Sequence, residues 1–216
     1  MRAIEAFHHR CGLTLALSVV LACASAACAD PPFRVADTRP SQKVDQSFVF
    51  VCDATGSTSP KFTALRVRLS RTIQNLRPAQ SFDVLFFGGN GTSSFSGWLK
   101  QPANLVVATS PNKNRFSEFF AAIVPHGSDS PLAAVEMAIQ EQPDVIYLLT
   151  DSLDESDKVA KRIRELNPDR KIRINTIAFL NNDEIKHHVD VTFKKFLKQI
   201  AEENGGTFND VNPDDL

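Results

Sequence analysis

Side chains that carry oxygen follow a buried apolar run early in the chain. Residues 48–52 are continuously apolar, and Asp53, Thr55 and Ser57 come directly after them at alternate positions. Gly56 lets the backbone bend sharply between the two hydroxyls. A carboxylate and two hydroxyls are hard oxygen donors, which suit Mg²⁺, Mn²⁺ or Ca²⁺. The spacing therefore predicts one loop of a divalent-cation site, with Mg²⁺ as the expected ion.

Two later loops carry similar side chains. Asp151 ends a second continuous apolar run, and Ser128, Asp129 and Ser130 precede a predicted helix. The carboxyl ends of parallel strands meet at one edge of a sheet, so we expect these loops to lie near Asp53. The plainer alternative for either Asp alone is a helix N-cap. The combination favours a cation site, with Ser128, Asp129 and Asp151 as further ligands.

Alternating strands and helices must position these loops. Apolar runs predict strands at 47–53, 81–87, 105–108, 144–151, 172–180 and 207–211. Apolar residues at helical spacing predict helices at 57–77, 112–123, 131–139, 154–166 and 191–204. Such alternation is typical of a mostly parallel sheet with helices on both faces, an α/β fold.

Details of this pattern are also predicted. Ser57 or Ser59 is expected to cap the first helix, and Met137 is expected to face the core. The stretch 92–101 is weakly patterned and has no assigned element.

The N-terminal residues have the layout of a targeting segment. Arg2 and Arg10 precede an apolar stretch, 13–23, and small residues end at Ala29. This predicts a signal peptide over 1–29, an extended linker over 30–46 and one domain over 47–216. An uncleaved N-terminal membrane anchor and a lipidated Cys23 remain open. Each alternative exports the domain, which is then secreted, periplasmic or tethered to the membrane.

Composition excludes several functional classes. A formal net charge of -1 gives no sign of a nucleic-acid surface. The four cysteines form no disulfide framework or zinc pattern, and Cys52 is expected in the core. No phosphate-loop or G-x-S-x-G motif is present. The glycines at 88–91 predict a turn, and His187–His188 predicts a solvated segment.

Three stretches resemble the von Willebrand factor A (VWA) family: FVFVCDATGS at 48–57, HGSDSPL at 126–132 and IYLLTDS at 146–152. Asp53, Thr55 and Ser57 match the Asp-x-Ser-x-Ser motif of that family's metal-ion-dependent adhesion site, and Asp151 matches its later Asp. Asp129 stands where the family has Thr, and Ser128 and Ser130, which flank it, could supply the hydroxyl after a shift of one residue.

The resemblance covers about 47–211 and is greatest to exported, bacterial-type domains that stand alone. It implies a Rossmann-like three-layer α/β/α fold. It also implies a non-catalytic module that binds an acidic residue of a protein partner through Mg²⁺, Mn²⁺ or Ca²⁺.

Two other functions remain open at this point. The same acidic loops could serve a metal-dependent hydrolase in which the ion activates water. A changed residue at position 129 also fits a VWA scaffold that has lost its metal.

Overall fold

A computed structural model describes residues 46–89, 91–100, 105–152, 155–182, 184 and 191–213. The predicted signal peptide, residues 30–45 of the predicted linker and His187–His188 lie outside these residues. No helix within the described ranges is long and apolar enough to cross a membrane.

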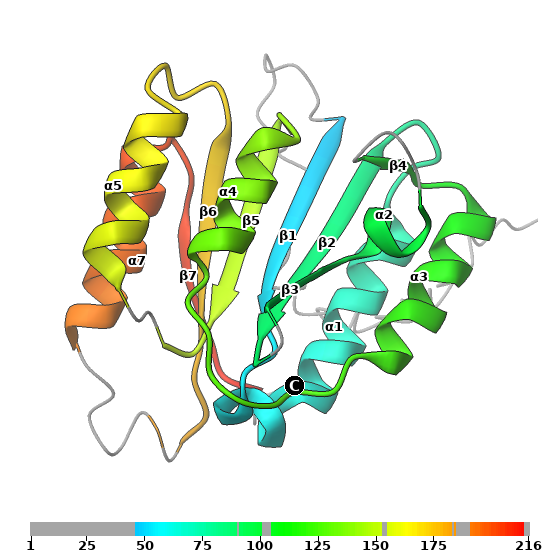
Figure 1. Ribbon diagram of the computed structural model, residues 1–216, viewed down its shortest axis with the longest axis horizontal. Helices are drawn as coiled ribbons and strands as arrows, with labels where there is room; N and C mark the ends of the chain where they lie inside the picture. The colour runs from blue at the N-terminus through cyan, green and yellow to red at the C-terminus, as the bar shows by residue number, and fades with distance from the viewer. Residues whose placement is uncertain are drawn as a thin grey trace, which may run out of the picture.

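A mostly parallel sheet forms the centre of the molecule (Figure 1). Its strands are β1 (Ser47–Asp53), β2 (Ser81–Gly88), β3 (Gly91–Ser94), β4 (Val106–Val107), β5 (Val145–Thr150), β6 (Arg173–Phe179) and β7 (Phe208–Val211). The order across the sheet is β3-β2-β1-β5-β6-β7, and β4 also pairs with β2. Only β3 and β4 run antiparallel to their neighbour among the described strands. The predicted α/β fold class is confirmed.

Helices cover both faces of this sheet. They are the 3₁₀ helix η1 (Gly56–Lys61), then α1 (Phe62–Asn75), α2 (Phe95–Trp98), α3 (Ser110–Ala122), α4 (Leu132–Gln140), α5 (Ser156–Leu166) and α7 (Val191–Glu203). One core joins the sheet to α1 and α3, and a second joins it to α4, α5 and α7. The result is a three-layer α/β/α arrangement.

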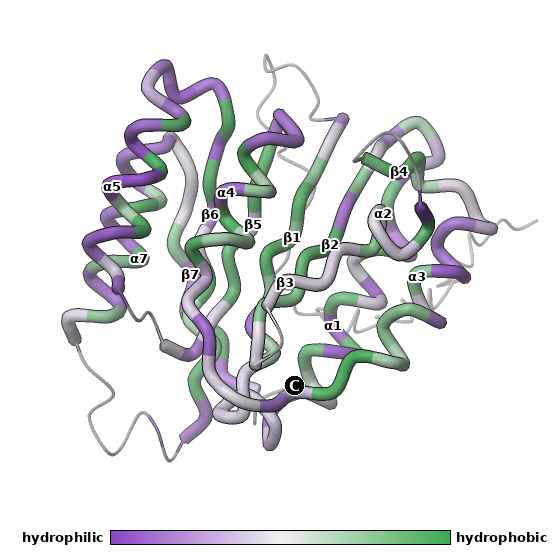
Figure 2. Tube along the Cα trace, in the orientation of Figure 1, coloured by the Kyte–Doolittle hydropathy of each residue, from purple (hydrophilic) through white to green (hydrophobic). Residues whose placement is uncertain are grey.

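Strand β1 contributes side chains to both cores. Phe48, Phe50 and Cys52 lie in the core under α1, whereas Val49 and Val51 lie in the core under α4. Successive side chains point to opposite faces of a strand, so a strand covered on both faces must be apolar throughout. Figure 2 shows this hydrophobic character along β1 and the hydrophilic surface of α5.

Three local predictions differ from the structure. The weakly patterned stretch 92–101, which had no assigned element, contains most of β3, a polar hairpin partner of β2 at the sheet edge, and the short helix α2. Met137 is 37% exposed, because the small residues Ala134 and Ala138 turn toward the sheet instead. The first helix begins as η1, and no serine side chain caps it.

Candidate metal centre

Strands β1 and β5 bring two carboxylates to the same edge of the sheet. The two strands pair in parallel with Cys52 opposite Leu149, so Asp53 lies beside Thr150. Thr150 Oγ1 donates a hydrogen bond of 2.6 Å to Asp53 Oδ2. Asp151 directly follows β5, and both Asp53 and Asp151 are almost completely buried. The register thus holds Asp53 in a fixed orientation.

The side chains of Asp53, Thr55, Ser57 and Asp151 form a continuous chain of hydrogen bonds. Thr55 Oγ1 donates to Asp53 Oδ1 over 2.7 Å and lies 3.0 Å from Ser57 Oγ. Ser57 Oγ donates to Asp151 Oδ1 over 2.9 Å. Adjacent ligands of an octahedral Mg²⁺ with bonds of about 2.1 Å lie about 3.0 Å apart. The three consecutive distances between these four oxygens therefore match those between adjacent ligands of such an ion.

The helix-cap alternative does not describe these residues. Asp53 Oδ1 accepts from the Thr55 backbone N over 2.8 Å, which orders the bend rather than a helix start. The N-cap position of η1 is Thr55, and its side chain caps no backbone N–H. Ser57, which we expected as a cap, points its hydroxyl at Asp151.

A second loop packs directly against this bend through its backbone. Gly56 N donates to Gly127 O over 2.8 Å, and His126 N donates to Ala54 O over 3.0 Å. Gly127 has a φ of +62°, and a Cβ there would lie 2.6 Å from the Cα of Gly89. The glycines at 88–91, predicted only to form a turn, thus let the backbone segments at 54–56, 88–89 and 126–127 pack together at the site. This packing role is invisible to motif matching.

The side chains of this second loop are used differently from those of the first. Asp129 Oδ1 accepts from Ser130 N over 2.8 Å, and Ser130 Oγ accepts from Leu132 N over 3.3 Å. Within the described ranges, neither Ser128 nor Asp129 hydrogen bonds to the other four predicted ligands. The structure thus brings four of the six predicted residues into direct contact and places the loop of the other two alongside.

A buried lysine that the sequence analysis missed completes the site. Lys61 Nζ lies 2.7 Å from Asp151 Oδ2 and 2.6 Å from Glu184 Oε1, and its side chain is 2% exposed. The two oxygens of Asp151 thus face different partners, Ser57 and Lys61. Lys61 follows Ser57 by four residues, about one helical turn, but this spacing is shared by many solvated lysines and does not single it out.

The electrostatics of the site favour a cation. Burial and the charge of Asp151 raise the pKa of Asp53, and hydrogen bonds from Thr150 and Thr55 oppose that rise. Burial also raises the pKa of the Cys52 thiol, which keeps it protonated in the core, as expected. No three Asp, Glu, His or Cys side chains gather as a metal cluster in the described part of the chain. Besides the carboxylates of Asp53 and Asp151, the side-chain oxygens in the hydrogen-bonded chain are the hydroxyls of Thr55 and Ser57.

Comparisons with solved structures agree with this architecture, whereas comparisons of sequence find no match. No protein-family model and no curated protein sequence matches the chain. Among solved structures, von Willebrand factor type A from Catenulispora acidiphila is 19% identical with a TM-score of 0.62, covering 79% of this chain and 39% of that one.

Two further structures are similar. One is proximal thread matrix protein 1 from the mussel byssus, with a zinc-occupied metal-ion-dependent adhesion site (MIDAS) motif. It is 18% identical with a TM-score of 0.55, and the match covers 79% of this chain and 42% of that one. Manganese-loaded TRAP protein of Plasmodium vivax is 14% identical with a TM-score of 0.53, covering 79% and 70%. This chain therefore has the fold of von Willebrand factor A domains.

Proposed function

We propose that the protein is an exported interaction module whose residues Asp53, Thr55, Ser57 and Asp151 bind a divalent cation. In this proposal a carboxylate of a protein partner completes the site. The observation that carries it is the unbroken chain of oxygens from Asp53 to Asp151, with consecutive distances of 2.7, 3.0 and 2.9 Å.

Each residue has a distinct part in this proposal. Asp53 supplies charge and is held by Thr150, while the hydroxyls of Thr55 and Ser57 are neutral donors. Asp151 presents one oxygen to the site, because Lys61 holds the other. With only two carboxylates, one of them paired with Lys61, a bound Mg²⁺ would stay under-neutralised and offer a coordination position to an external acid. The donor set thus suits recognition of a partner carboxylate.

The second loop is the remaining part of the proposed site. We propose that Ser128 or Asp129 supplies a further ligand, directly or through water. The backbone bond between Gly56 and Gly127 supports this, because it fixes the start of the loop against the first motif.

Two of the similar structures support the choice of ligand class. One carries a zinc-occupied MIDAS motif and the other is loaded with manganese. We propose a binding role rather than catalysis. A hydrolase would need a general base, and His126 is the single histidine in the described ranges. Its Nδ1 lies 2.9 Å from the backbone oxygen of Val124.

Export is a separate part of the proposal. Residues 1–29 would direct export and residues 30–46 would space the domain from the membrane or from the cleavage site. Mass spectrometry of the mature protein tests this directly. A mature N-terminus near Asp30 supports cleavage, and an intact, membrane-associated N-terminus supports an anchor.

Thermal melting with and without divalent ions tests the proposed site. An ion at a concentration 100 times its Kd stabilises the native state by about 2.7 kcal/mol. At about 2–4 °C per kcal/mol for a domain of this size, the melting temperature should rise by about 5–10 °C. We expect this rise with Mg²⁺ or Mn²⁺ and its loss in Asp53→Ala.

Two further variants sharpen the melting experiment. Asp169→Ala removes an exposed carboxylate whose ion-pair partner among the described residues is Lys171, so it should retain the full rise. Asp129→Ala tests the second loop, and a reduced rise would assign Asp129 to the site. Equal melting temperatures in Mg²⁺ and in chelator for the wild-type protein would contradict the proposal and favour a metal-free scaffold.

A further inference from the structure

The segment that follows the first metal loop is strongly basic. Residues 56–80 contain no Asp or Glu, although the formal net charge of the whole chain is -1. The segment's basic residues are Lys61, Arg66, Arg68, Arg71 and Arg77. An isolated block of one charge on a helix attracts ligands of the opposite charge.

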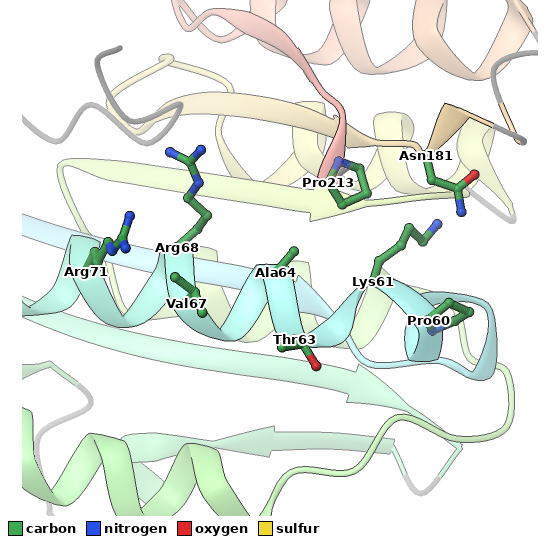
Figure 3. Close-up of a pocket in the computed structure, with 9 residues that line it drawn as sticks. All are labelled: Pro60, Lys61, Thr63, Ala64, Val67, Arg68, Arg71, Asn181 and Pro213. Atoms are coloured by element: carbon green, nitrogen blue, oxygen red, sulfur yellow. The ribbon is translucent and has the colours of Figure 1, made fainter. Parts of the chain in front are cut away.

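A cleft of about 400 Å³ runs along this helix (Figure 3). Val67, Arg68 and Arg71 line it from α1, and Asn181 and Pro213 line it from the ends of β6 and β7. Figure 3 shows Lys61 and Arg68 extending from the helix toward the side where Asn181 and Pro213 lie. Val67 is 45% exposed and adds an apolar contact surface between the charges.

The two arginines of the cleft differ from Arg66 in their contacts with the described residues. Arg66, on another side of α1, donates to the carbonyls of Phe120 and Ile123 and is thereby occupied. Arg68 and Arg71, in contrast, have no ion pair with any described residue. They lie three residues apart on one helix, so both guanidinium groups can engage the same ligand segment.

The cleft lies next to the proposed metal site, with Lys61 between the two. This lysine lines the cleft and also contacts Asp151. Arg68 lies two helical turns further along, at about 1.5 Å per residue a distance of about 10 Å. An extended peptide covers about 3.3 Å per residue, so three to four residues span the stretch from Lys61, which contacts Asp151, to Arg68.

We propose that the partner segment is acidic at two places. One carboxylate reaches the metal site, and a second acidic residue, three or four positions away, pairs with Arg68 and Arg71. This inference rests on the proposed function, and it adds the chemistry and the direction of the partner: an extended acidic segment that follows α1.

Selection from a random peptide library, displayed on phage and captured by the full protein in Mg²⁺, tests this proposal. We expect selected peptides to carry two acidic positions three or four residues apart. Fluorescence polarisation then measures the Kd of labelled selected peptides. Replacing both cleft arginines, Arg68→Gln with Arg71→Gln, should weaken binding about tenfold and reduce its salt dependence.

The control removes the same charge elsewhere. Arg115 lies exposed on α3 and Lys171 lies exposed in the turn before β6. The double variant Arg115→Gln/Lys171→Gln should bind as tightly as the wild-type protein. Melting curves of both double variants confirm that each is folded before Kd values are compared.

The possible failures are distinguishable. Peptide binding that needs Mg²⁺ but is equal in the two double variants overturns this inference and leaves the proposed function intact. Binding that survives chelator and Asp53→Ala contradicts the proposed function itself. Selection of no acidic peptide overturns the inference, as does binding to phosphatidylserine vesicles that depends on Arg68 and Arg71, which would assign the cleft to a membrane surface.

Discussion

Replacing Lys61 with methionine tests how charge is balanced at the site. The ammonium group lies 2.7 Å from Asp151 and 2.6 Å from Glu184, with its side chain 2% exposed. Methionine fills similar space but leaves Asp151 buried beside Asp53 without a cation. Removing one partner of a buried ion pair costs about 3–5 kcal/mol. We expect Lys61→Met to lose about this much stability in chelator.

A divalent ion should offset part of that loss. Without the lysine charge, the site attracts a cation more strongly, so the affinity for Mg²⁺ should rise by about tenfold, or about 1.4 kcal/mol. Urea denaturation in chelator and in Mg²⁺ measures both effects. The deficit of Lys61→Met should be smaller in Mg²⁺ than in chelator, and calorimetric titration should give a lower Kd.

Lys113 provides the matched control. It is also buried, and its Nζ donates to Gln74 O over 2.9 Å, within the contact between α3 and the end of α1. Lys113→Met should be destabilised equally in Mg²⁺ and in chelator. The reasoning is refuted if Lys61→Met behaves like this control, or if it binds Mg²⁺ more weakly than the wild-type protein.

Three further changes probe the sheet that positions the site. Burial and the nearby charge of Asp83 raise the pKa of Glu141 from 4.5 to about 9. The stability that this protonated group contributes is complete below pH 4.5 and is lost as the pH rises to about 9. Glu141 is partly exposed, so the wild-type protein should lose about 1–3 kcal/mol of its free energy of unfolding across this pH range, measured by urea titration. The Glu141→Gln variant should not show this loss. Gly88→Ala would place a Cβ 2.6 Å from Ala54 O, so melting should show destabilisation of about 1–3 kcal/mol and a smaller Mg²⁺ shift; unchanged melting would contradict the close approach. Phe86→Ala removes a ring 2% exposed from the core under α1, and urea denaturation should show a loss of about 3–5 kcal/mol with an unchanged response to Mg²⁺.

Strongly patterned segments of the fold were predictable from the sequence. The apolar runs of β1 and β5 can be buried only in a sheet covered on both faces, and each ends in a carboxylate. Helix α7 ends at Glu203, close to the predicted end at 204, and Gly205 then adopts a positive φ of +66°, as is typical of glycine just after a helix. In these segments, local propensity and tertiary packing favour the same structure.

Elements that depend on partners elsewhere in the chain were not predictable. Strand β3 is short and polar, and only its pairing with β2 makes it a strand. Met137 gave a false apolar signal, because alanines allow α4 to approach the sheet closely.

The candidate site likewise has residues that were predictable from the sequence and residues that were not. Asp53, Thr55 and Ser57 are neighbours in sequence, so their spacing predicted their convergence. The pairing of Lys61 with Asp151 joins residues 90 positions apart, and a lysine at the start of an amphipathic helix resembles any solvated lysine. Loop 128–130 lies beside the site, but Asp129 and Ser130 hydrogen bond to backbone N–H groups of their own loop and of Leu132, a use that the sequence pattern does not reveal.

Binding of Mn²⁺, followed by electron paramagnetic resonance, tests the central claim most directly, since the signal of the free ion is lost when the ion binds. We predict saturable loss of signal at one ion per chain in the wild-type protein. The double variant Thr55→Val/Ser57→Ala, which keeps both carboxylates, should bind at least about tenfold more weakly, because the hydroxyl ligands are gone. Wild-type protein that leaves the Mn²⁺ signal unchanged, or a double variant that binds as tightly, would contradict the claim that these four side chains form a cation site.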